Sequence, residues 1–204
     1  RRYLEELIEG RLSTAKILER GKKLGLDMSA EYYQIMLFKY NFKNTEEGYS
    51  KELLKLNKTL NDVNSRYKNI IFFNREIEGN VLIIKGKTLE NIDETRRKYI
   101  KEIKEIFSFY PKVSYFGGIG RPVNRLTRIP KSYESAAIIF VRRFIVDKSA
   151  IISSDQYLDH VYEEDGTSIT ALDLGEIDLK KAEEFLKSGD ANEVHLFIEE
   201  LLRS

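Results

Sequence analysis

Residues 113–152 read VSYFGGIGRPVNRLTRIPKSYESAAIIFVRRFIVDKSAII, a stretch that contains each kind of element needed for an α/β core. Its first four residues, Val113–Phe116, predict a short strand, because β-branched and aromatic residues favour extended backbone. Glycines follow at positions 117, 118 and 120. Because glycine adopts turn conformations that other residues avoid, we expect the strand to end there in a glycine corner.

An arginine-bearing loop and a helix are expected after the glycines. Pro122 and Pro130 are predicted to keep the loop between them out of a helix. Ser132 is then predicted as the N-cap of a helix that carries Glu134 in its first turn. A fifth strand is expected at 150–152. The predicted apolar face of the helix consists of Tyr133, Ala136, Ala137, Phe140, Val141 and Phe144.

The elements before this unit follow a regular order. Tyr33–Phe38 is an apolar run that predicts a buried strand, and a loop is expected at 41–48. From Tyr49 to Tyr67, apolar residues recur at steps of four and three, which is the spacing of one helix face. That predicted face consists of Tyr49, Leu53, Leu56, Leu60, Val63 and Tyr67.

A hairpin and a second long helix complete the pattern. The apolar runs 69–73 and 80–84 enclose Gly79 and Asn80, which suit a tight turn, and Gly86 is expected to end the hairpin. The helix is expected to end before Pro111. The order β-α-β-β-α-β predicts an α+β fold of ferredoxin type, with one further αβ unit appended. The predicted face of the helix consists of Ile92, Tyr99, Ile103 and Ile106.

Helical patterns flank this core on both sides, so three parts are expected: a helical lead-in at 1–28, a core domain at 29–154, and an acidic loop with two helices at 155–204. Apolar helices at the edge of a domain either pair with a neighbouring molecule or pack on their own domain, and the pattern alone allows both. Since the chain begins and ends on helical patterns, we expect a fragment of a longer protein. The lead-in is expected to form two helices, and the second is expected to be capped by Ser13 and ended by Gly25. The apolar face of the first consists of Tyr3, Leu4, Leu7 and Ile8, and that of the second of Ile17, Leu18 and Leu24.

Composition narrows the classes of function. The 204 residues include 34 Lys and Arg against 33 Asp and Glu, a formal net charge of +1. This balance gives no overall attraction to nucleic acid, so the chain itself is not expected to grip DNA. The absence of cysteine excludes disulfides and thiolate chemistry and suits a reducing cytoplasm. No apolar run approaches the roughly 20 residues of a membrane span, and the two histidines form no metal motif.

Three stretches carry a resemblance to a known family: 1–26 (RRYLEELIEG…GKKLGLD), 117–137 (GGIGRPVNRLTRIPKSYESAA) and 185–202 (FLKSGDANEVHLFIEELL). Together with the element order, they resemble the GGDEF fold of diguanylate cyclases. In particular, the chain resembles the degenerate GGDEF-like domain in the middle of bacterial AraC-type response regulators. Sugar-diacid and purine-catabolism regulators of the CdaR/PucR type contain a related domain. The resemblance implies a phospho-receiver domain before the chain and a helix-turn-helix DNA-binding domain after it.

The residues at the expected cyclase positions argue against catalysis. Resemblance implies that acidic residues at the end of the first strand would hold Mg²⁺, which prefers carboxylate oxygens. Lys39 and Asn41 occupy the expected acidic positions, so we expect no metal, no cofactor and no catalytic residue. The signature hairpin corresponds to 75–81 (REIEGNV), which keeps a single glycine and has no Asp-Glu pair in register. Neither a P-loop nor a dinucleotide fingerprint is formed by the glycines at 117–120.

Two interpretations of the glycines remain open. They are a turn that lets neighbouring backbone approach closely, or they form an anion site whose amides act with Arg121, Arg125 and Arg128. The hypothetical ligand or anion site as a whole comprises Asn41, Gly79, Asn80, Gly117, Gly118, Arg121 and Arg125.

Three alternative functions are compatible with these observations. The first is a non-catalytic domain that transmits a signal in a cytoplasmic transcription regulator, as a homodimer joined along helices at 1–24 and 178–203. The second is a sensor with a nucleotide or small-anion pocket near Asn41, Asn80 and Arg121. The third, which Lys39 and the hairpin disfavour, is an active diguanylate cyclase. DNA would be bound by a separate domain of the parent protein, and no membrane is expected as a partner.

Overall fold

The computed structural model describes residues 2–42, 49–75, 79–144 and 149–154. The acidic loop and the helical pair predicted at 155–204 lie outside the described residues. The helices are α1 (Arg2–Ile8), α2 (Thr14–Lys23), α3 (Tyr49–Arg66), α4 (Leu89–Ser108) and α5 (Ile129–Phe140), with short 3₁₀ turns η1 (Leu126–Arg128) and η2 (Val141–Phe144). The strands are β1 (Tyr32–Phe42), β2 (Ile70–Arg75), β3 (Gly79–Gly86), β4 (Val113–Ile119) and β5 (Ala150–Ser153).

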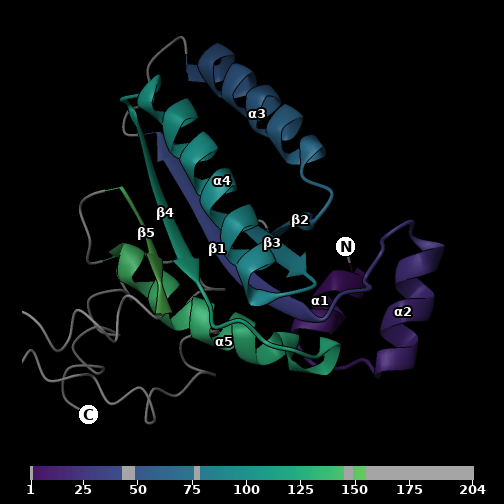
Figure 1. Ribbon diagram of the computed structural model, residues 1–204. Coiled ribbons are helices and arrows are strands. Elements are labelled where there is room, and N and C mark those ends of the chain that lie inside the picture. The colour runs from purple at the N-terminus through teal and green to yellow at the C-terminus, as the bar shows by residue number, and fades with distance from the viewer. Residues whose placement is uncertain (1, 43–48, 76–78, 145–148, 155–204) are drawn as a thin grey trace, which may run out of the picture.

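A single five-stranded sheet forms the centre of the fold, in the order β2-β3-β1-β4-β5 (Figure 1). β1 lies in the middle and pairs antiparallel with β3 and β4, so that Leu37 lies between Val81 and Gly118. The predicted β-α-β-β-α-β order is confirmed, and α5 and β5 are the appended unit, with β5 parallel to β4. The fold is therefore α+β, consistent with a GGDEF-like core.

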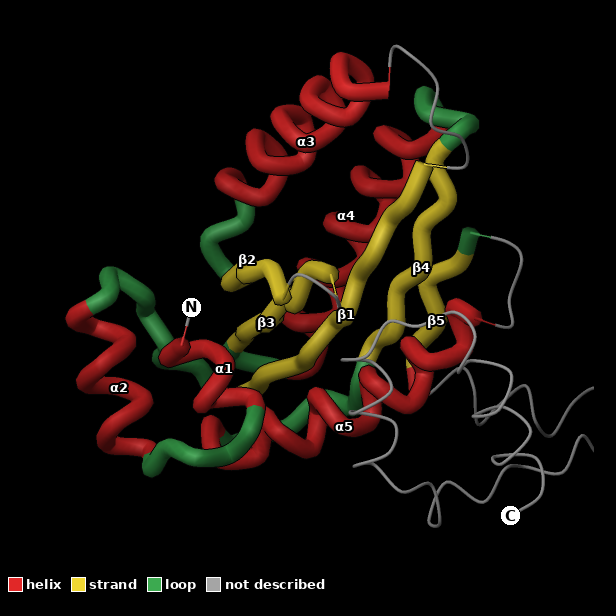
Figure 2. The backbone as a smooth tube through the Cα atoms, turned by 180° about the vertical axis from the view of Figure 1, so that it is seen from behind, coloured by secondary structure: helices red, strands yellow, loops and turns green. Residues whose placement is uncertain are grey.

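Helices cover both faces of the sheet. α3 and α4 lie on one face, and α1 and α5 lie on the other (Figures 1 and 2). Alternate side chains of β1 supply two separate hydrophobic clusters, with Ile35 and Leu37 in one and Met36 and Phe38 in the other. A sheet covered on both faces needs a continuous apolar run rather than an alternating one. This is why residues 33–38 are all buried.

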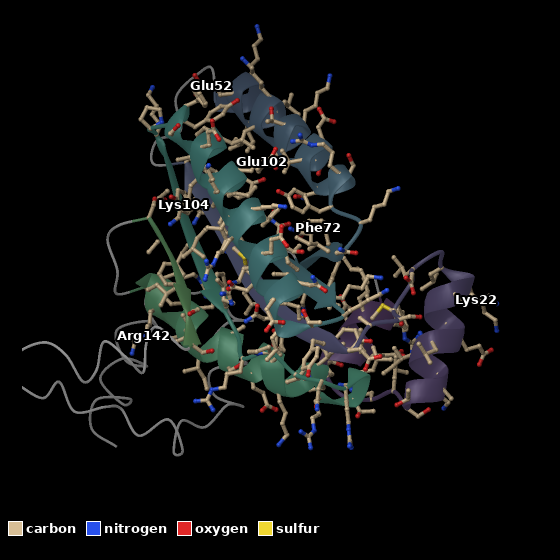
Figure 3. All side chains as sticks on the ribbon, in the orientation of Figure 1. Lys22, Glu52, Phe72, Glu102, Lys104 and Arg142 are labelled. Atoms are coloured by element: carbon tan, nitrogen blue, oxygen red, sulfur yellow. The ribbon has the colours of Figure 1, made fainter. Side chains whose placement is uncertain are left out.

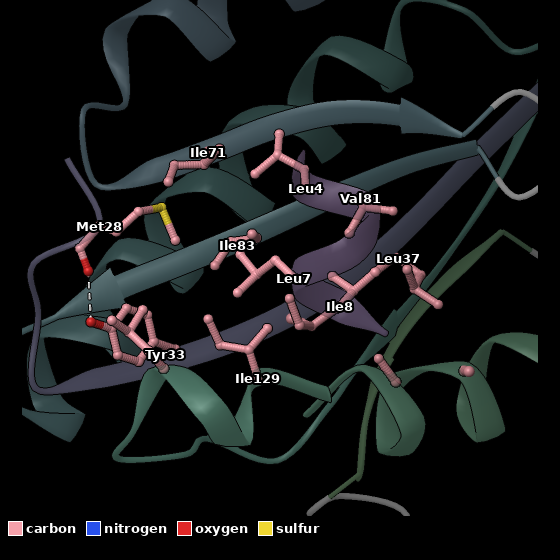
Figure 4. Close-up of a cluster of buried hydrophobic side chains, with 14 of the residues drawn as sticks. Leu4, Leu7, Ile8, Met28, Tyr33, Leu37, Ile71, Val81, Ile83 and Ile129 are labelled. Carbon is pink, nitrogen blue, oxygen red and sulfur yellow. Dashed lines mark hydrogen bonds between the residues drawn. The ribbon is translucent and has the colours of Figure 1, made fainter. Parts of the chain in front are cut away.

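The first helix is part of the core. Tyr3, Leu4, Leu7 and Ile8 are buried, and Leu7 is only 1% exposed. Figure 4 shows the apolar side of α1 against Ile83 of β3 and Ile129 of α5. The apolar stripe of α1 therefore packs on its own domain rather than pairing with a neighbouring molecule.

The second helix begins and ends where the sequence predicted, but its stripe is only partly buried. Gly25 has a φ of +70° and closes α2, with the Leu26 N–H donating to the Gly21 carbonyl at 2.9 Å. Ile17 is buried, whereas Leu18 is 42% and Leu24 57% exposed. Of the predicted apolar face, only Ile17 therefore packs on the domain, and Leu18 and Leu24 stay exposed.

The hairpin and the two long helices are confirmed, but the tight turn is not at Gly79 and Asn80, because both residues lie in β3 and pair with Arg75 and Asn74 of β2. β2 and β3 pair antiparallel, and Gly86 is the last residue of β3. Ile92, Tyr99 and Ile103 are buried on α4, and Leu56, Leu60 and Val63 on α3. Among the described helices, none is long and apolar enough to cross a membrane.

The predicted glycine corner was wrong, because β4 continues through it to Ile119. Gly117 and Gly118 lie inside the strand, between β1 and β5. A Cβ atom on Gly118 would lie 2.7 Å from the carbonyl oxygen of Ala136. The glycines thus let α5 pack directly on the backbone of β4, and the close-approach interpretation is the one that the structure supports.

The start of α5 also differs from the expectation. The helix begins at Ile129 and takes Pro130 into its first turn, where the missing N–H has no intrahelical acceptor to lose. Ser132 is not the N-cap. It is buried within the helix, and its Oγ accepts a hydrogen bond of 2.9 Å from the Ile35 N–H of β1. The predicted end of the apolar face, Phe144, lies in η2 and is 38% exposed.

Candidate functional site

A cleft of about 510 Å³ opens between α3 and the sheet. Its floor is formed by β1, β2 and β3, and Tyr99 of α4 closes one side. The long axis of α3 is visible beside the sheet in Figures 1 and 2. The cleft therefore lies where five consecutive elements of the chain, from β1 to α4, meet.

Asparagine dominates the polar lining of this cleft. On α3, Asn57, Asn61 and Asn64 are four and three residues apart and so share one helix face. That spacing was visible in the sequence beside the apolar stripe, but it was not recognised as a site. The six asparagines of the lining are Asn41, Asn57, Asn61, Asn64, Asn74 and Asn80.

Tyrosine hydroxyls fix two of these amides. The Tyr99 hydroxyl donates to Asn64 Oδ1 at 3.0 Å, and the Tyr40 hydroxyl donates to Asn57 Oδ1. Burial raises the pKa of both tyrosines, so both hydroxyls stay protonated and remain donors at neutral pH. These bonds hold α3 to β1 and α4, and they use the amide oxygen but not the amide nitrogen of each asparagine.

Other amides of the lining have free hydrogen-bonding capacity. Asn74 Nδ2 donates to Asn80 Oδ1 across the hairpin at 3.2 Å, which uses only one of the hydrogen-bonding groups of each amide. Asn61 lies between Asn57 and Asn64 on α3, and its side chain is exposed. Within the described part of the chain, no side-chain hydrogen bond of Asn61 is recorded.

Aromatic rings provide the apolar walls. Phe38 and Tyr40 come from β1, Phe72 from β2 and Tyr99 from α4. The ring of Phe72 lies 5.6 Å from that of Tyr99, centroid to centroid. The cleft thus combines flat apolar surfaces with amide groups, the combination that small-molecule sites use to bind and orient a ligand.

Lys39 and Asn41, the residues at the expected metal positions, lie at the end of β1 and both contribute to the cleft. Phe38 and Tyr40 face the cluster under α3 and α4, so strand alternation turns the side chains of Lys39 and Asn41 to the other side. The pKa of Lys39 is lowered, first by burial and then by the nearby charge of Arg143 in η2. Asn41 is exposed beside Ser114 of β4.

The hypothetical ligand site separates into three places. Asn41, Gly79 and Asn80 meet at the cleft. At Gly79 the φ is +86°, and a Cβ atom there would lie 2.8 Å from the Phe38 carbonyl, so this position accepts only glycine without strain. Gly117 and Gly118 lie within a strand that is paired on both sides, and Gly118 lies under α5. Their amides therefore do not form an anion-binding nest.

Arg121 and Arg125 lie at the opposite end of the sheet. The Arg121 N–H donates to Ser135 Oγ at 2.8 Å, and the preceding Gly120 N–H donates to the Ile35 carbonyl. Asn41 is six positions further along β1 than Ile35, a distance of about 20 Å. The proposed grouping of Asn41, Asn80 and Arg121 in one pocket was therefore wrong.

The described residues offer little to a metal ion. Among them, no group of three or more His, Cys, Asp or Glu side chains is placed to hold one. Lys39 is the one charged residue among the described residues at the cleft, and its side chain lies on the opposite face of the sheet.

The fold and the cleft define an α+β domain of ferredoxin type with a small-molecule-sized cavity beside the hairpin. A family model described as GGDEF-like domain matches residues 9–138, and the chain belongs to this family. No curated protein matched the chain.

Proposed function

We propose that the chain is a non-catalytic regulatory domain of a bacterial transcription regulator with the AraC-type response-regulator architecture. The proposal combines the family assignment with the resemblance of 117–137 and of the helical ends to such proteins. In this architecture the domain lies between a receiver and a helix-turn-helix domain in the cytoplasm. It passes on the state of the receiver, while the separate domain binds DNA.

The composition of the cleft carries the non-catalytic part of the proposal. Transfer of a nucleotidyl group needs Mg²⁺ held by hard carboxylate oxygens. The described lining supplies amides and hydroxyls instead, and Lys39 and Asn41 stand at the end of β1 where the resemblance places acidic residues. This erosion of the acidic positions is what we mean by a degenerate GGDEF-like domain.

Signal transmission in the proposed homodimer would require contact between helices. The apolar face of α1 is already buried in its own core, so it does not serve this purpose without unfolding. Leu18 and Leu24 on α2 are exposed and are the apolar residues that the lead-in offers to a second copy. A shift in such a helix contact would alter the spacing of two DNA-binding domains.

A second function, sensing of a small molecule, is favoured by the cleft itself. Its volume of about 510 Å³ lies within the range of roughly 300–1,000 Å³ typical of small-molecule sites. Its amides and rings provide both orientation and apolar surface. The two functions are compatible, because a ligand that bound between α3 and the sheet would bias the packing that the domain transmits.

Incubation of the chain with GTP and Mg²⁺ tests the non-catalytic assignment. We expect no cyclic di-GMP and no pyrophosphate release, because the described residues of the lining contribute no carboxylate oxygen to hold the metal. An active diguanylate cyclase assayed in parallel establishes that the reagents and detection work. Product formation that Mg²⁺ removal abolishes would overturn the proposal, since it would show a functioning metal site.

A further inference from the structure

Charge is distributed unevenly along this nearly neutral chain. Residues 106–133 contain five Lys or Arg but no Asp or Glu, and residues 155–179 contain eight Asp or Glu but no Lys or Arg. Oppositely charged stretches attract each other where the fold brings them within about a Debye length, roughly 8–10 Å at physiological salt. The net charge of +1 therefore conceals two complementary stretches.

Four of the basic residues gather where β4 leads into α5. This basic patch consists of Arg121, Arg125, Arg128 and Lys131, which are all exposed. Arg125 and Arg128 stand three positions apart across η1, a spacing that places side chains on one side of a 3₁₀ turn. The Arg121 N–H donates to Ser135 Oγ at 2.8 Å, which brings the start of the loop beside the first turns of α5. The patch is therefore compact.

The charges of the patch are not neutralised within the described domain. None of its four members forms an ion pair with a residue that the structure describes, whereas Arg11 pairs with Glu9 at 3.1 Å. A solvated face usually mixes charges of both signs, which keeps like charges from repelling one another. A single-sign patch of this kind instead favours an anionic partner.

The acidic stretch leaves the sheet beside this patch. β5 runs parallel to β4 and pairs Ser153 with Ile119, so both strands end at the same end of the sheet (Figure 1). Arg121 follows Ile119 by two positions, and the described chain stops at residue 154. An extended chain spans about 3.3–3.6 Å per residue, so residues 155–165 can span up to about 35 Å from that point. The carboxylates are thus tethered within reach of the patch.

We propose that residues 155–178 bind the basic patch of the same chain through their carboxylates. Exposed ion pairs contribute little individually, so the contact depends on several pairs and on the tether, which raises the effective concentration of the acidic stretch. The patch also lies beside the turn between α1 and α2, because a Cβ atom on Gly10 would lie 3.2 Å from Pro130 Cγ. The contact ties the part of the chain after the domain to its lead-in, and it does not depend on the function proposed above.

Zero-length cross-linking tests the contact, because a carbodiimide joins an amine to a carboxylate only where the two touch. Lys131 supplies the one amine side chain of the patch. A mixture of unlabelled and isotope-labelled full chain is cross-linked, digested and analysed by mass spectrometry. We expect Lys131 to be joined to acidic residues of 155–178 within chains of a single isotope. Links of Lys131 only to Glu134 or to acids outside 155–178 would overturn the proposal. Links between isotopes would also overturn it, because they would assign the acidic stretch to a second copy.

Neutral substitutions show whether charge holds the contact. Arg125→Gln with Arg128→Gln keeps Lys131 and should lower its yield of links to 155–178 by about fivefold or more, as should raising the salt to about 0.5 M. Lys101→Gln with Lys104→Gln is the matched control, because it removes the same charge from exposed residues of α4 on the other face of the sheet. The control should leave the yield unchanged. Equal yields in the two double variants would refute the contact.

Nucleic acid is the competing occupant of a basic patch. A random-sequence DNA duplex is added to the full chain at about 0.15 M salt before cross-linking. We expect the Lys131 links to persist, because the tethered stretch is present at a high effective concentration. Their loss at micromolar duplex would overturn the proposal, since the patch would then bind nucleic acid in preference to the carboxylates of its own chain.

Discussion

At the scale of single residues, the tightest constraint lies where α5 meets β4. A Cβ atom on Gly120 would be 1.9 Å from the carbonyl oxygen of Ser132, so backbone would have to move to admit it. A Cβ atom on Gly117 would instead meet the ends of the Ile151 and Met36 side chains, both at 3.1 Å. Side-chain ends can shift by a few tenths of an ångström, whereas a helix carbonyl cannot do so alone.

Alanine substitutions at these two glycines should therefore differ. We expect Gly120→Ala to lower the free energy of unfolding by about 1–3 kcal/mol or more, because overpacking forces the helix away from the strand. Gly117→Ala should cost about 1 kcal/mol or less. Urea unfolding followed by circular dichroism measures both. Equal losses in the two variants would mean that α5 does not sit against Gly120 as closely as described.

The residue scale is also where sequence reasoning failed most clearly. Three glycines and two prolines suggested a corner and a loop, because these residues most often mark turns. In the structure, Gly118 is needed for close packing of a helix, and Pro130 occupies a helical first turn. The use of Gly118 depends on Ala136 and Phe140, about 20 residues away, and local patterns carry no information about them. Proline in a helical first turn is a local preference, and it was read here as a loop signal instead.

At the scale of elements, α3 is joined to α4 by polar contacts at its carboxyl end. Arg66 forms an ion pair with Glu102, and the Tyr67 hydroxyl donates to the other oxygen of that carboxylate at 2.9 Å. Glu102, labelled in Figure 3, lies on the side of α4 that faces α3. The contact ties the carboxyl end of α3 to α4.

Tyr67 makes stability sensitive to high pH. Burial, and then the hydrogen bond to Glu102, raise its pKa from 10.0 to about 12, so the folded state favours the protonated phenol. Its contribution is complete below pH 10.0 and is lost as the pH rises towards about 12. We expect the free energy of unfolding to fall over this interval, and to fall less steeply in Tyr67→Phe.

A conservative substitution of Glu102 separates the two causes of the raised pKa of Tyr67, burial and the hydrogen bond. Glu102→Gln removes the charge but keeps an acceptor, so the pKa of Tyr67 should drop while burial still holds it above the usual value. Spectrophotometric titration of the phenols monitors this directly. If Tyr67→Phe had the same alkaline slope as the unmodified chain, the contact between α3 and α4 would not contribute as described.

The elements themselves were the most predictable part of the fold. Helix periodicity and strand runs are local, so α3, α4 and the hairpin could be located from the sequence. The cleft could not, because it is made where Asn57, Asn74 and Tyr99 come together from three elements. Only the stripe of asparagines on α3 gave a local signal. The grouping of Arg121 with Asn41 failed for the same reason, since strand register decides it.

At the scale of the whole molecule, the sheet separates two cores, and α1 belongs to the one shared with α5. The matched family region begins at residue 9, after α1 ends at Ile8. Yet Leu7 is among the most buried side chains of the chain. The burial of α1 thus contributes to the stability of the domain, whereas the exposed leucines Leu18 and Leu24 lie on α2 and at its carboxyl end.

Leucine substitutions on the two helices should separate folding from assembly. Leu7→Ala leaves a cavity in the core and is expected to lower the free energy of unfolding by about 2–5 kcal/mol. Leu24→Lys changes a side chain that is 57% exposed, so unfolding should change by no more than about 0.5 kcal/mol. In the proposed homodimer, however, Leu24→Lys places a charge in the contact between copies, and sedimentation should show dissociation to monomers.

A chain that sediments as a monomer at all concentrations, with or without Leu24→Lys, would contradict assembly through α2. A stable Leu7→Ala variant would contradict the place of α1 in the core. Because the two readouts respond to different helices, each outcome can be assigned without ambiguity.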